Sequence, residues 1–207
     1  EASRATNLLR ALGVAYSSMN LQTAAARVIE KVIAVEEIAS GADNPELAVP
    51  LTNLGTIYLQ QEELAKAMAA LDRAFALQAD DPSPAVLTNL GRVHKAQGEF
   101  VRAEEFFLLA LSKMGEDRIV PVLFELGETQ FALQKIDDSR RTMERVLVMQ
   151  ERTFGKNHAS LIPTLRGLAE AYFEEDSIQD AAKILERTVD IIELDRGPHL
   201  SMEPIFQ

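Results

Sequence analysis

The pentapeptide Leu-Thr-Asn-Leu-Gly occurs twice in the chain, at residues 51–55 and again, 36 residues later, at residues 87–91. Behind both copies, small and large residues recur at the same distances from the glycine. These residues are Ala67, Leu71 and Ala74 in the first copy and Ala103, Phe107 and Ala110 in the second. A period of 20–50 residues is the signature of a repeat architecture, and it constrains the fold more than any other feature of this sequence.

The same frame extends in both directions along the chain. Each glycine position follows a leucine, and in three of the five copies a tyrosine stands three residues later. The glycine position is held, at intervals of 42, 36, 36 and 42 residues, by Gly13, Gly55, Gly91, Gly127 and Ala169. This pattern resembles the tetratricopeptide repeat (TPR), a pair of antiparallel helices. The resemblance covers about residues 4–195 and implies an all-α fold, a right-handed superhelical solenoid of about five antiparallel helix pairs.

Apolar residues at helical spacing predict ten helices, and every break between them carries Gly, Pro, Asp or Asn. No stretch shows the alternation that is typical of a strand. The predicted helices span about residues 2–18, 21–39, 45–60, 63–79, 84–97, 99–113, 118–133, 137–152, 160–175 and 177–195. We predict a single TPR-like solenoid over residues 1–198, followed by a tail at residues 199–207. Its repeats are expected at about residues 6–47, 48–83, 84–119, 120–161 and 162–198.

Two positions of the frame predict local structure, one inside the first helix and one at the start of the helix at residues 84–97. Gly13 lies inside a predicted helix, where glycine costs about 1 kcal/mol relative to alanine. The resemblance implies that the partner helix approaches closely there, with the small residue Ala25 opposite. Before the helix predicted at residues 84–97, Ser83 is expected as the N-cap and Pro84 as the first helical residue.

The two 42-residue intervals are 8 residues longer than a repeat of 34, and the surplus is expected to lengthen the second helix of the pair and its loop. Residues 149–158, which include Gly155-Lys156-Asn157-His158, look like the long inter-repeat connection of kinesin light chains. Residues 36–45 are a looser version of it. His158 is expected to cap the following helix. The similarity concerns a subtype of repeat and does not identify a motor protein.

Composition excludes several classes of function. The net charge of −11 argues against nucleic acid or an anionic membrane as the main partner. No apolar run approaches the 18 residues of a membrane helix, so no membrane insertion is predicted. The absence of cysteine excludes disulfides and thiolate sites. The chain begins without Met, which suggests an excised or processed fragment. The localisation is left open, with the cytoplasm favoured.

The sequence contains no constellation that predicts catalysis. The three histidines lie far apart, and no paired-histidine metal motif or phosphate-binding loop is present. His94 occupies the aromatic position of its copy, where we expect it to pack. Acidic clusters such as Asp80-Asp81 are interpreted as solvated loops. We therefore predict no catalytic residue, no metal, no cofactor and no enzymatic activity.

The resemblance implies that the first helix of each pair lines a concave groove that binds a segment of a partner protein. In this family an asparagine at the position of Asn53 and Asn89 often grips the backbone of the ligand, because an amide both donates and accepts hydrogen bonds. The alternative without a binding function is that both are polar residues tolerated on a helix face. The predicted groove residues are Arg10, Asn53, Thr56, Asn89, Arg92, Lys95, Phe124, Glu128, Phe131, Arg166 and Glu170.

The charges of this predicted groove are unevenly distributed along the sequence. Basic side chains occur in its N-terminal half, while glutamates and phenylalanines occur in its C-terminal half. A ligand with an acidic part and a basic, apolar part would complement this pattern. The acidic tail of a heat-shock chaperone is not expected as a ligand. Val14, Ala85 and Asn89 cannot supply the carboxylate clamp that the family uses for such tails.

These observations predict a protein-protein interaction scaffold or adaptor. One alternative is a regulatory module that senses a short peptide, and another is a non-catalytic accessory domain of a larger protein. The expected partner is a protein or peptide segment, and neither nucleic acid nor a membrane. The segment around Ile205 and Phe206 is too short for a good capping helix. A homo-oligomer formed through an uncapped C-terminal end is therefore possible.

Overall fold

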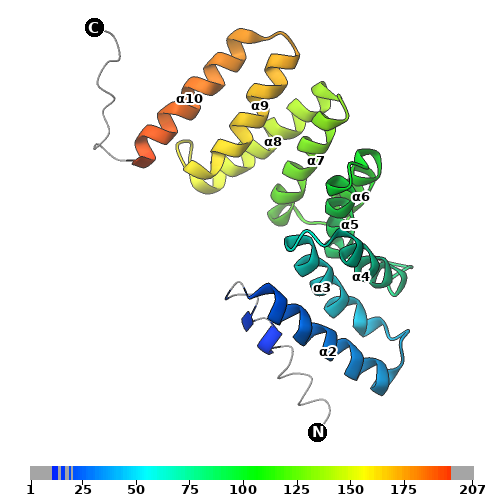
Figure 1. The fold of residues 1–207 in the computed structure, drawn as a ribbon. Coiled ribbons are helices and arrows are strands. Elements are labelled where there is room, and N and C mark those ends of the chain that lie inside the picture. Colours follow the sequence, from blue (N-terminus) through cyan, green and yellow to red (C-terminus); the bar gives the residue numbers. More distant parts are fainter. Residues whose placement is uncertain (1–10, 14, 17–18, 20, 197–207) are drawn as a thin grey trace. The chain divides into compact units, whose positions relative to one another are not determined.

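The computed structural model describes residues 11–13, 15–16, 19 and 21–196, and all regular structure in this part of the chain is helical. Figure 1 shows helices that follow one another as antiparallel pairs, which confirms the all-α, TPR-like fold. The predicted helix at residues 2–18 lies largely outside the described residues, of which 11–13 and 15–16 are helical. The described residues fall into two compact units that divide between Met114 and Gly115. The assignment of one solenoid domain remains a prediction.

From residue 21 on, the first unit contains one long helix, two pairs of short helices and a 3-10 helix. The helices are α2 (Gln22–Ser40), η1 (Pro45–Leu47), α3 (Ala48–Gln60), α4 (Leu64–Ala76), α5 (Pro84–Ala96) and α6 (Phe100–Ser112). The second helix of each pair covers the first, and their facing sides form a continuous apolar core. Fully buried side chains of this core include Leu47, Leu71 and Leu90.

The second unit repeats this arrangement with longer second helices. Its helices are η2 (Glu116–Arg118), α7 (Val120–Ala132), α8 (Ile136–Phe154), η3 (Ala159–Leu161), α9 (Ile162–Glu174) and α10 (Ile178–Arg196). Leu161, Leu165 and Ile191 form a buried cluster where η3, α9 and α10 meet. The short 3-10 helices η1, η2 and η3 differ from the sequence prediction, which merges them with α3, α7 and α9 or with the loops before them.

The glycines of the repeat frame pack against the second helix of their pair. An added Cβ would lie 2.5 Å from Leu71 at Gly55, 2.7 Å from Phe107 at Gly91 and 2.9 Å from Met143 at Gly127. This close approach is the reason that the sequence predicts for a glycine inside a helix. The expected partner is wrong, however, because the nearest atoms to Gly13 belong to Ile29 and Val28 and not to Ala25. The glycine is required by the large residue sixteen positions later.

In the four pairs whose turn the structure describes, this turn puts one residue in the left-handed region of backbone conformation. Its φ is +59° at Glu62, +78° at Gly98, +61° at Gln134 and +57° at Asp176. Each of these residues stands seven positions after the anchor of its copy. Only one copy uses glycine, which adopts this conformation without the steric cost that a Cβ brings. The turn geometry is therefore imposed by the packing of the two helices rather than by a glycine.

The surplus of the 42-residue intervals lies in the helices α2 and α8, as predicted. Each has 19 residues, whereas α4 and α6 have 13. Both long helices end at a glycine, Gly41 with φ 88° and ψ 158° and Gly155 with φ 89° and ψ 163°. This backbone conformation is essentially restricted to glycine. The two long connections of this chain therefore share a backbone turn that requires glycine.

In each of the two long connections, an arginine at the equivalent position forms an ion pair and a hydrogen bond to a backbone carbonyl. The Arg73 guanidinium pairs with Glu37 and donates from Nη2 to the carbonyl of Ala42 at 2.9 Å. The equivalent contacts 114 residues later are those of Arg187 with Glu151 at 2.5 Å and with the carbonyl of Lys156 at 2.7 Å. The cap after each long helix is also repeated. Asn44 Oδ1 accepts from Glu46 N, and His158 Nδ1 accepts from Ser160 N at 3.2 Å, as predicted for His158.

The start of α5 and the surroundings of His94 were also predicted from the sequence. Ser83 and Pro84 stand at the N-cap and first position of α5, but the Ser83 side chain makes no capping hydrogen bond. His94 is buried and packs, as predicted. Its ring stacks on Phe106 with a centroid distance of 5.3 Å, and Nδ1 lies 2.9 Å from a carboxylate oxygen of Glu99.

Candidate partner-binding site

The predicted groove residues lie on the first helices of the pairs. Arg10 lies outside the described residues. The others are Asn53 and Thr56 on α3, Asn89, Arg92 and Lys95 on α5, Phe124, Glu128 and Phe131 on α7, and Arg166 and Glu170 on α9. Each unit therefore carries its own part of the predicted surface. Their role in binding a partner remains a prediction.

In the first unit, the two predicted asparagines have different surroundings. Asn53 is exposed on α3, whereas Asn89 on α5 is only 6% exposed. The Asn89 amide nitrogen donates to Thr56 Oγ1 at 2.8 Å, and its Oδ1 accepts from Arg92 Nη1 at 3.4 Å. Thr56 Oγ1 in turn donates to the carbonyl of Thr52 at 2.9 Å. The Asn89 side chain thus fills the space between α3 and α5, and a ligand would have to compete for its amide.

In the second unit, five of the predicted residues surround one hollow of about 200 Å³. The hollow lies between α7 and α9, with α8 behind it. Its lining consists of Phe124, Glu128, Phe131, Ser139, Met143, Pro163, Arg166, Gly167 and Glu170. The sequence prediction had assigned five of these residues to the groove without predicting a cavity between them.

The hollow has an apolar interior and charged sides. Phe124 and Phe131 are partly buried on α7, and Met143 is 1% exposed on α8. Ser139 is also buried, and its hydroxyl is held by donation to the carbonyl of Gly127 at 2.8 Å. The charged side chains are two glutamates and one arginine. Arg166 Nε lies 3.7 Å from a carboxylate oxygen of Glu170, one helical turn away. The lining therefore carries a net negative charge.

Gly167 is one of four residues of the hollow that are not among the predicted groove residues. It stands two positions before the anchor Ala169, as Asn89 stands two positions before Gly91. The three atoms nearest to a Cβ on Gly167 would all belong to the Met143 side chain, the methyl carbon being nearest at 3.3 Å. Its backbone has no positive φ. The backbone conformation therefore does not explain a glycine here, and a Cβ would require the Met143 methyl group to shift by a few tenths of an ångström.

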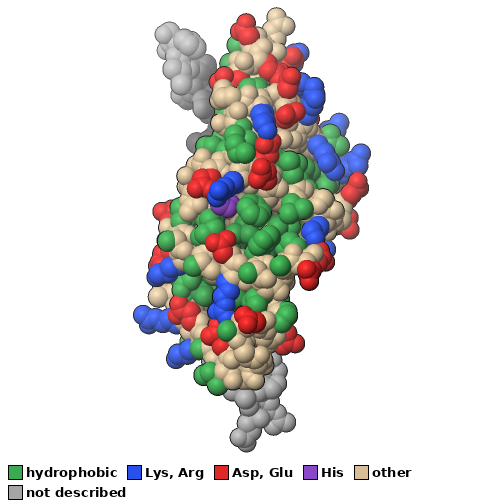
Figure 2. All heavy atoms as spheres, turned by 90° about the vertical axis from the view of Figure 1, so that its right-hand side faces the viewer, with side chains coloured by type: hydrophobic (Ala, Val, Ile, Leu, Met, Phe, Trp, Pro, Cys, Tyr) green, Lys and Arg blue, Asp and Glu red, His purple; other side chains and the backbone are tan. Residues whose placement is uncertain are grey.

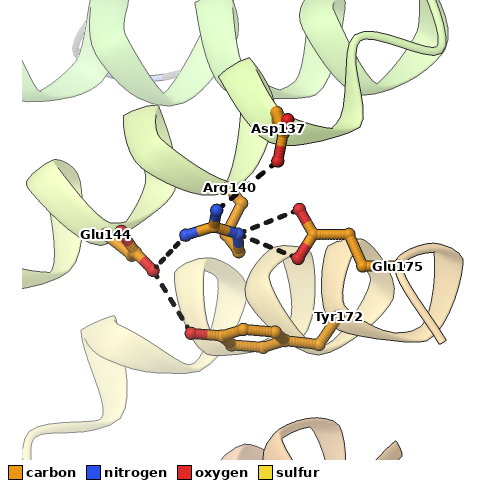
Figure 3. A network of polar contacts seen from close by, with 5 residues as sticks. All are labelled: Asp137, Arg140, Glu144, Tyr172 and Glu175. Carbon is orange, nitrogen blue, oxygen red and sulfur yellow. Dashed lines mark hydrogen bonds and ion pairs between the residues drawn. The ribbon is translucent and has the colours of Figure 1, made fainter. Parts of the chain in front are cut away.

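A second polar feature of this unit is the network around Arg140 in Figure 3. The arginine lies between carboxylates of its own helix and of the turn after α9. Its Nε donates to both carboxylate oxygens of Glu175, at 2.9 and 3.0 Å, and Nη1 donates to Glu144 at 2.9 Å. These bonds raise the pKa of Arg140, so that it stays charged. The sequence prediction misses this network because Glu175 is 35 residues away.

Tyr172 joins the same network and has a counterpart in the first unit. Its hydroxyl donates to Glu144 Oε1 at 3.2 Å, and Tyr58 donates in the same way to Glu30, which also precedes it by 28 residues. Burial raises the pKa of both tyrosines, and the neighbouring glutamate adds to the effect. The pKa of Tyr58 is raised to about 12. These bonds tie α2 to α3 and α8 to α9.

Figure 2 shows hydrophobic side chains gathered near the middle of one face, with charged side chains of both signs around them. Within the first unit, α6 exposes Val101, Leu108 and Leu109. These three residues form an apolar patch on a second helix of a pair, whereas the predicted binding residues lie on first helices. The patch provides a useful control surface for binding experiments.

Within the described part of the chain, no group of three or more histidine, aspartate or glutamate side chains could hold a metal ion. None of the described helices combines the length and the apolar character that a membrane span requires.

Two family models of the tetratricopeptide repeat match the chain, one over residues 52–118 and the other over residues 119–193. Together they span more than half of its length. The chain belongs to the tetratricopeptide repeat family. Repeats of this family support a general role as a protein-interaction scaffold. No curated protein matches the sequence.

Solved structures resemble the chain over nearly its whole length. The TPR-like repeats of a kinesin light chain from Podosopora anserina align with a TM-score of 0.77 and 20% identity, over 95% of this chain and 99% of that one. MamA protein aligns with a TM-score of 0.70 and 16% identity, over 96% and 98%. BtubC (BKLC) from P. vanneervenii aligns with a TM-score of 0.69 and 20% identity, over 98% and 92%. At these identities the likeness concerns the fold.

Proposed function

We propose that the chain is a non-catalytic protein-interaction scaffold that binds a segment of a partner protein along the first helices of its pairs. The observation that carries this proposal is the hollow between α7 and α9, where residues of two first helices converge on an open space. Its volume of about 200 Å³ is below the range of roughly 300–1,000 Å³ that is typical of small-molecule sites. It suits one anchoring side chain of a longer ligand.

The composition of the hollow supports a protein ligand. Interfaces derive much of their binding free energy from a few side chains buried in well-packed pockets, surrounded by polar contacts. Phe124, Phe131 and Met143 offer the apolar contact area, and charged side chains stand at its sides. In the first unit, the exposed amide of Asn53 is available on α3 for the backbone of an extended segment. Both features lie on first helices, as the family resemblance predicts.

The test is affinity capture from a lysate of the source organism with three forms of the chain. Gly167→Leu fills the hollow, because its side chain points at Met143 and into the open volume. Ala182→Leu is the matched control, since it adds the same side chain at an exposed position of α10. Circular dichroism first establishes that all three forms are equally helical.

We expect proteins that bind the wild type and Ala182→Leu to be lost from Gly167→Leu. Equal capture by all three forms would contradict the proposal. A fourth form, Leu108→Glu, changes the apolar patch of α6 and should retain the same proteins. Loss of capture with Leu108→Glu alone would assign binding to the second helices instead.

A further inference from the structure

The charged side chains around the hollow already have partners. Arg166 Nε lies 3.7 Å from a carboxylate oxygen of Glu170 on the same helix. Glu128, the remaining carboxylate of the lining, also has an interaction of its own. A cationic side chain would have to compete with Arg166 for Glu170, and an anionic one would have to compete with Glu170 for Arg166. An occupant of either charge therefore competes with contacts that the structure already contains.

The interior of the hollow is apolar, and the charged groups stand at its sides. Phe124 and Phe131 of α7 are partly buried, and Met143 of α8 is 1% exposed. The hydroxyl of Ser139 is buried and already donates to the carbonyl of Gly127 at 2.8 Å. A charged group that enters such a space loses hydration that phenyl rings and a thioether do not replace. The interior therefore favours an uncharged, apolar side chain.

The size of the hollow and the two rings in its lining fit a phenyl group. Its volume is about 200 Å³. Apolar protein cavities of about 150 Å³ bind benzene. Aromatic rings that meet edge to face or in offset stacks gain stability beyond the burial of their area, and a methionine sulfur is attracted to a ring. Because Phe124, Phe131 and Met143 supply both kinds of contact, an aromatic side chain fits better than an aliphatic one of the same size.

The first unit lacks these features at the equivalent positions. Thr52 on α3 stands at the position of Phe124. Leu59 stands at the position of Phe131. The space between α3 and α5 is filled by Asn89, whose amide donates to α3 at 2.8 Å. A hollow lined by two aromatic rings therefore belongs to the second unit and does not follow from the repeat frame.

Building on the proposed function, we propose that the hollow between α7 and α9 accepts the phenyl ring of a phenylalanine in the partner segment. The ring contacts Phe124, Phe131 and Met143. The pair of Arg166 and Glu170 stays intact beside it. The occupant is thus selected by its shape and its ring contacts, and a charge of either sign is disfavoured.

The test uses the whole chain with methyl-13C-labelled methionine and four blocked peptides of the form Ac-Ala-Ala-X-Ala-Ala-NH2. X is phenylalanine, cyclohexylalanine, arginine or glutamate. Cyclohexylalanine matches the size of phenylalanine and lacks the aromatic ring, so the series separates ring contacts from apolar size and from charge. The chain has six methionines, and the Met143 methyl signal is identified with Met143→Leu. We expect the phenylalanine peptide to shift this signal saturably, at a concentration several-fold below that of the cyclohexylalanine peptide and far below those of the two charged peptides.

Two phenylalanine variants sharpen the assignment. Phe131→Leu keeps an apolar side chain in the lining and removes one ring, so it should weaken binding of the phenylalanine peptide about threefold or more. The cyclohexylalanine peptide should lose less. Phe173→Leu is the matched control, because Phe173 stands at the same frame position of α9, is 47% exposed and does not line the hollow. It should leave the binding of both peptides unchanged.

Three results would overturn the inference. The cyclohexylalanine peptide could bind as tightly as the phenylalanine peptide, one of the charged peptides could bind best, or none of the four could shift the Met143 signal. The proposed function would still stand in each case if Gly167→Leu abolished capture of a partner. It would fail separately if Gly167→Leu captured the same proteins as the wild type.

Discussion

The two units solve the same packing problem with different side chains at equivalent positions. In the first unit, Asn89 reaches from α5 to Thr56 on α3 and closes the space between the two helices. In the second unit, Gly167 stands at the position of Asn89 and the space between α7 and α9 is open. The repeat frame thus determines where the helices lie, and residues outside the frame determine whether a surface is filled or hollow.

The difference is easiest to see in the glycines. Gly55, Gly91 and Gly127 are frame positions, where the facing helix leaves no room for a methyl group. Gly167 is a half-buried position with a weaker constraint, because an added Cβ would lie 3.3 Å from the Met143 methyl carbon. Glycine in a helix interior costs about 1 kcal/mol relative to alanine. Two kinds of glycine therefore occur on similar helices, one that is packed against the second helix of its pair and one that borders the hollow.

The largest expected loss of stability comes from a substitution at a glycine of the repeat frame. Gly91→Ala places a Cβ 2.7 Å from the ring of Phe107, which is fully buried and cannot move without disturbing its neighbours. We expect the free energy of unfolding to fall by about 2 kcal/mol or more, as is usual for overpacked cores. Urea denaturation followed by circular dichroism measures it. A loss below about 0.5 kcal/mol, the range of ordinary surface substitutions, would contradict the packing role of this glycine.

The next largest expected effect is a difference in stability between alanine substitutions at Asn89 and at Asn53. Asn89→Ala removes a buried amide and leaves the Thr56 hydroxyl without that donor, so we expect a loss of about 1–2 kcal/mol. Asn53→Ala, at the same frame position but exposed, should change stability by no more than about 0.5 kcal/mol. Thermal or urea unfolding of the two variants side by side gives the comparison. Equal effects would mean that the two asparagines have the same structural role.

The Arg140 network gives a smaller effect that is confined to the second unit. The frame places Ala26 and Gln61 at the positions of Arg140 and Glu175 in the first unit, so the ion pair has no counterpart there. Arg140→Met keeps the stem and removes the guanidinium, and the side chains of the pair are only 22% exposed. We expect a loss of about 1 kcal/mol, which high salt reduces. Arg141→Met, the exposed neighbour on α8, is the control and should be neutral.

The smallest effect is visible only at high pH. The pKa of Tyr58 is raised from its usual 10.0 to about 12 by burial and by the bond to Glu30. The folded chain therefore holds the tyrosine proton more firmly than the unfolded chain, and the resulting stability is fully present below pH 10. It is lost as the pH rises through 12. Ultraviolet titration of the three tyrosines should show Tyr58 ionising late, and Glu30→Gln should lower its pKa. A Tyr58 that ionises near pH 10 would contradict this.

Much of the fold could be predicted from the sequence because small and large side chains recur at fixed positions in each repeat. Leu-Gly followed by a large residue sixteen positions later specifies a close helix contact within one pair, which is a local relation. The ten predicted helices follow from it, and so do the longer second helices before Gly41 and Gly155. The identity of the closest residue to Gly13 was harder to predict, because Ala25 and Ile29 lie one turn apart on the same face of α2.

The candidate site could be predicted only in part. The register placed Phe124, Glu128 and Glu170 on first helices, but their convergence depends on contacts between helices about 40 residues apart in the sequence. A search for functional residues considers side chains that are present, whereas the hollow depends on one that is missing at Gly167. The burial of Asn89 was missed for a related reason, since its partner Thr56 is 33 residues away.

The most direct test of the account is the stability of Gly167→Ala, measured by urea denaturation beside Gly91→Ala. The added Cβ would lie 3.3 Å from the terminal methyl carbon of Met143, so this end of an unbranched side chain has to move by a few tenths of an ångström into the hollow. We expect Gly167→Ala to stabilise the chain by about 0.5–1 kcal/mol through helix propensity, while Gly91→Ala destabilises it. If Gly167→Ala destabilises the chain as much as Gly91→Ala does, the space between α7 and α9 is filled in solution. The contrast between the two units would then be wrong.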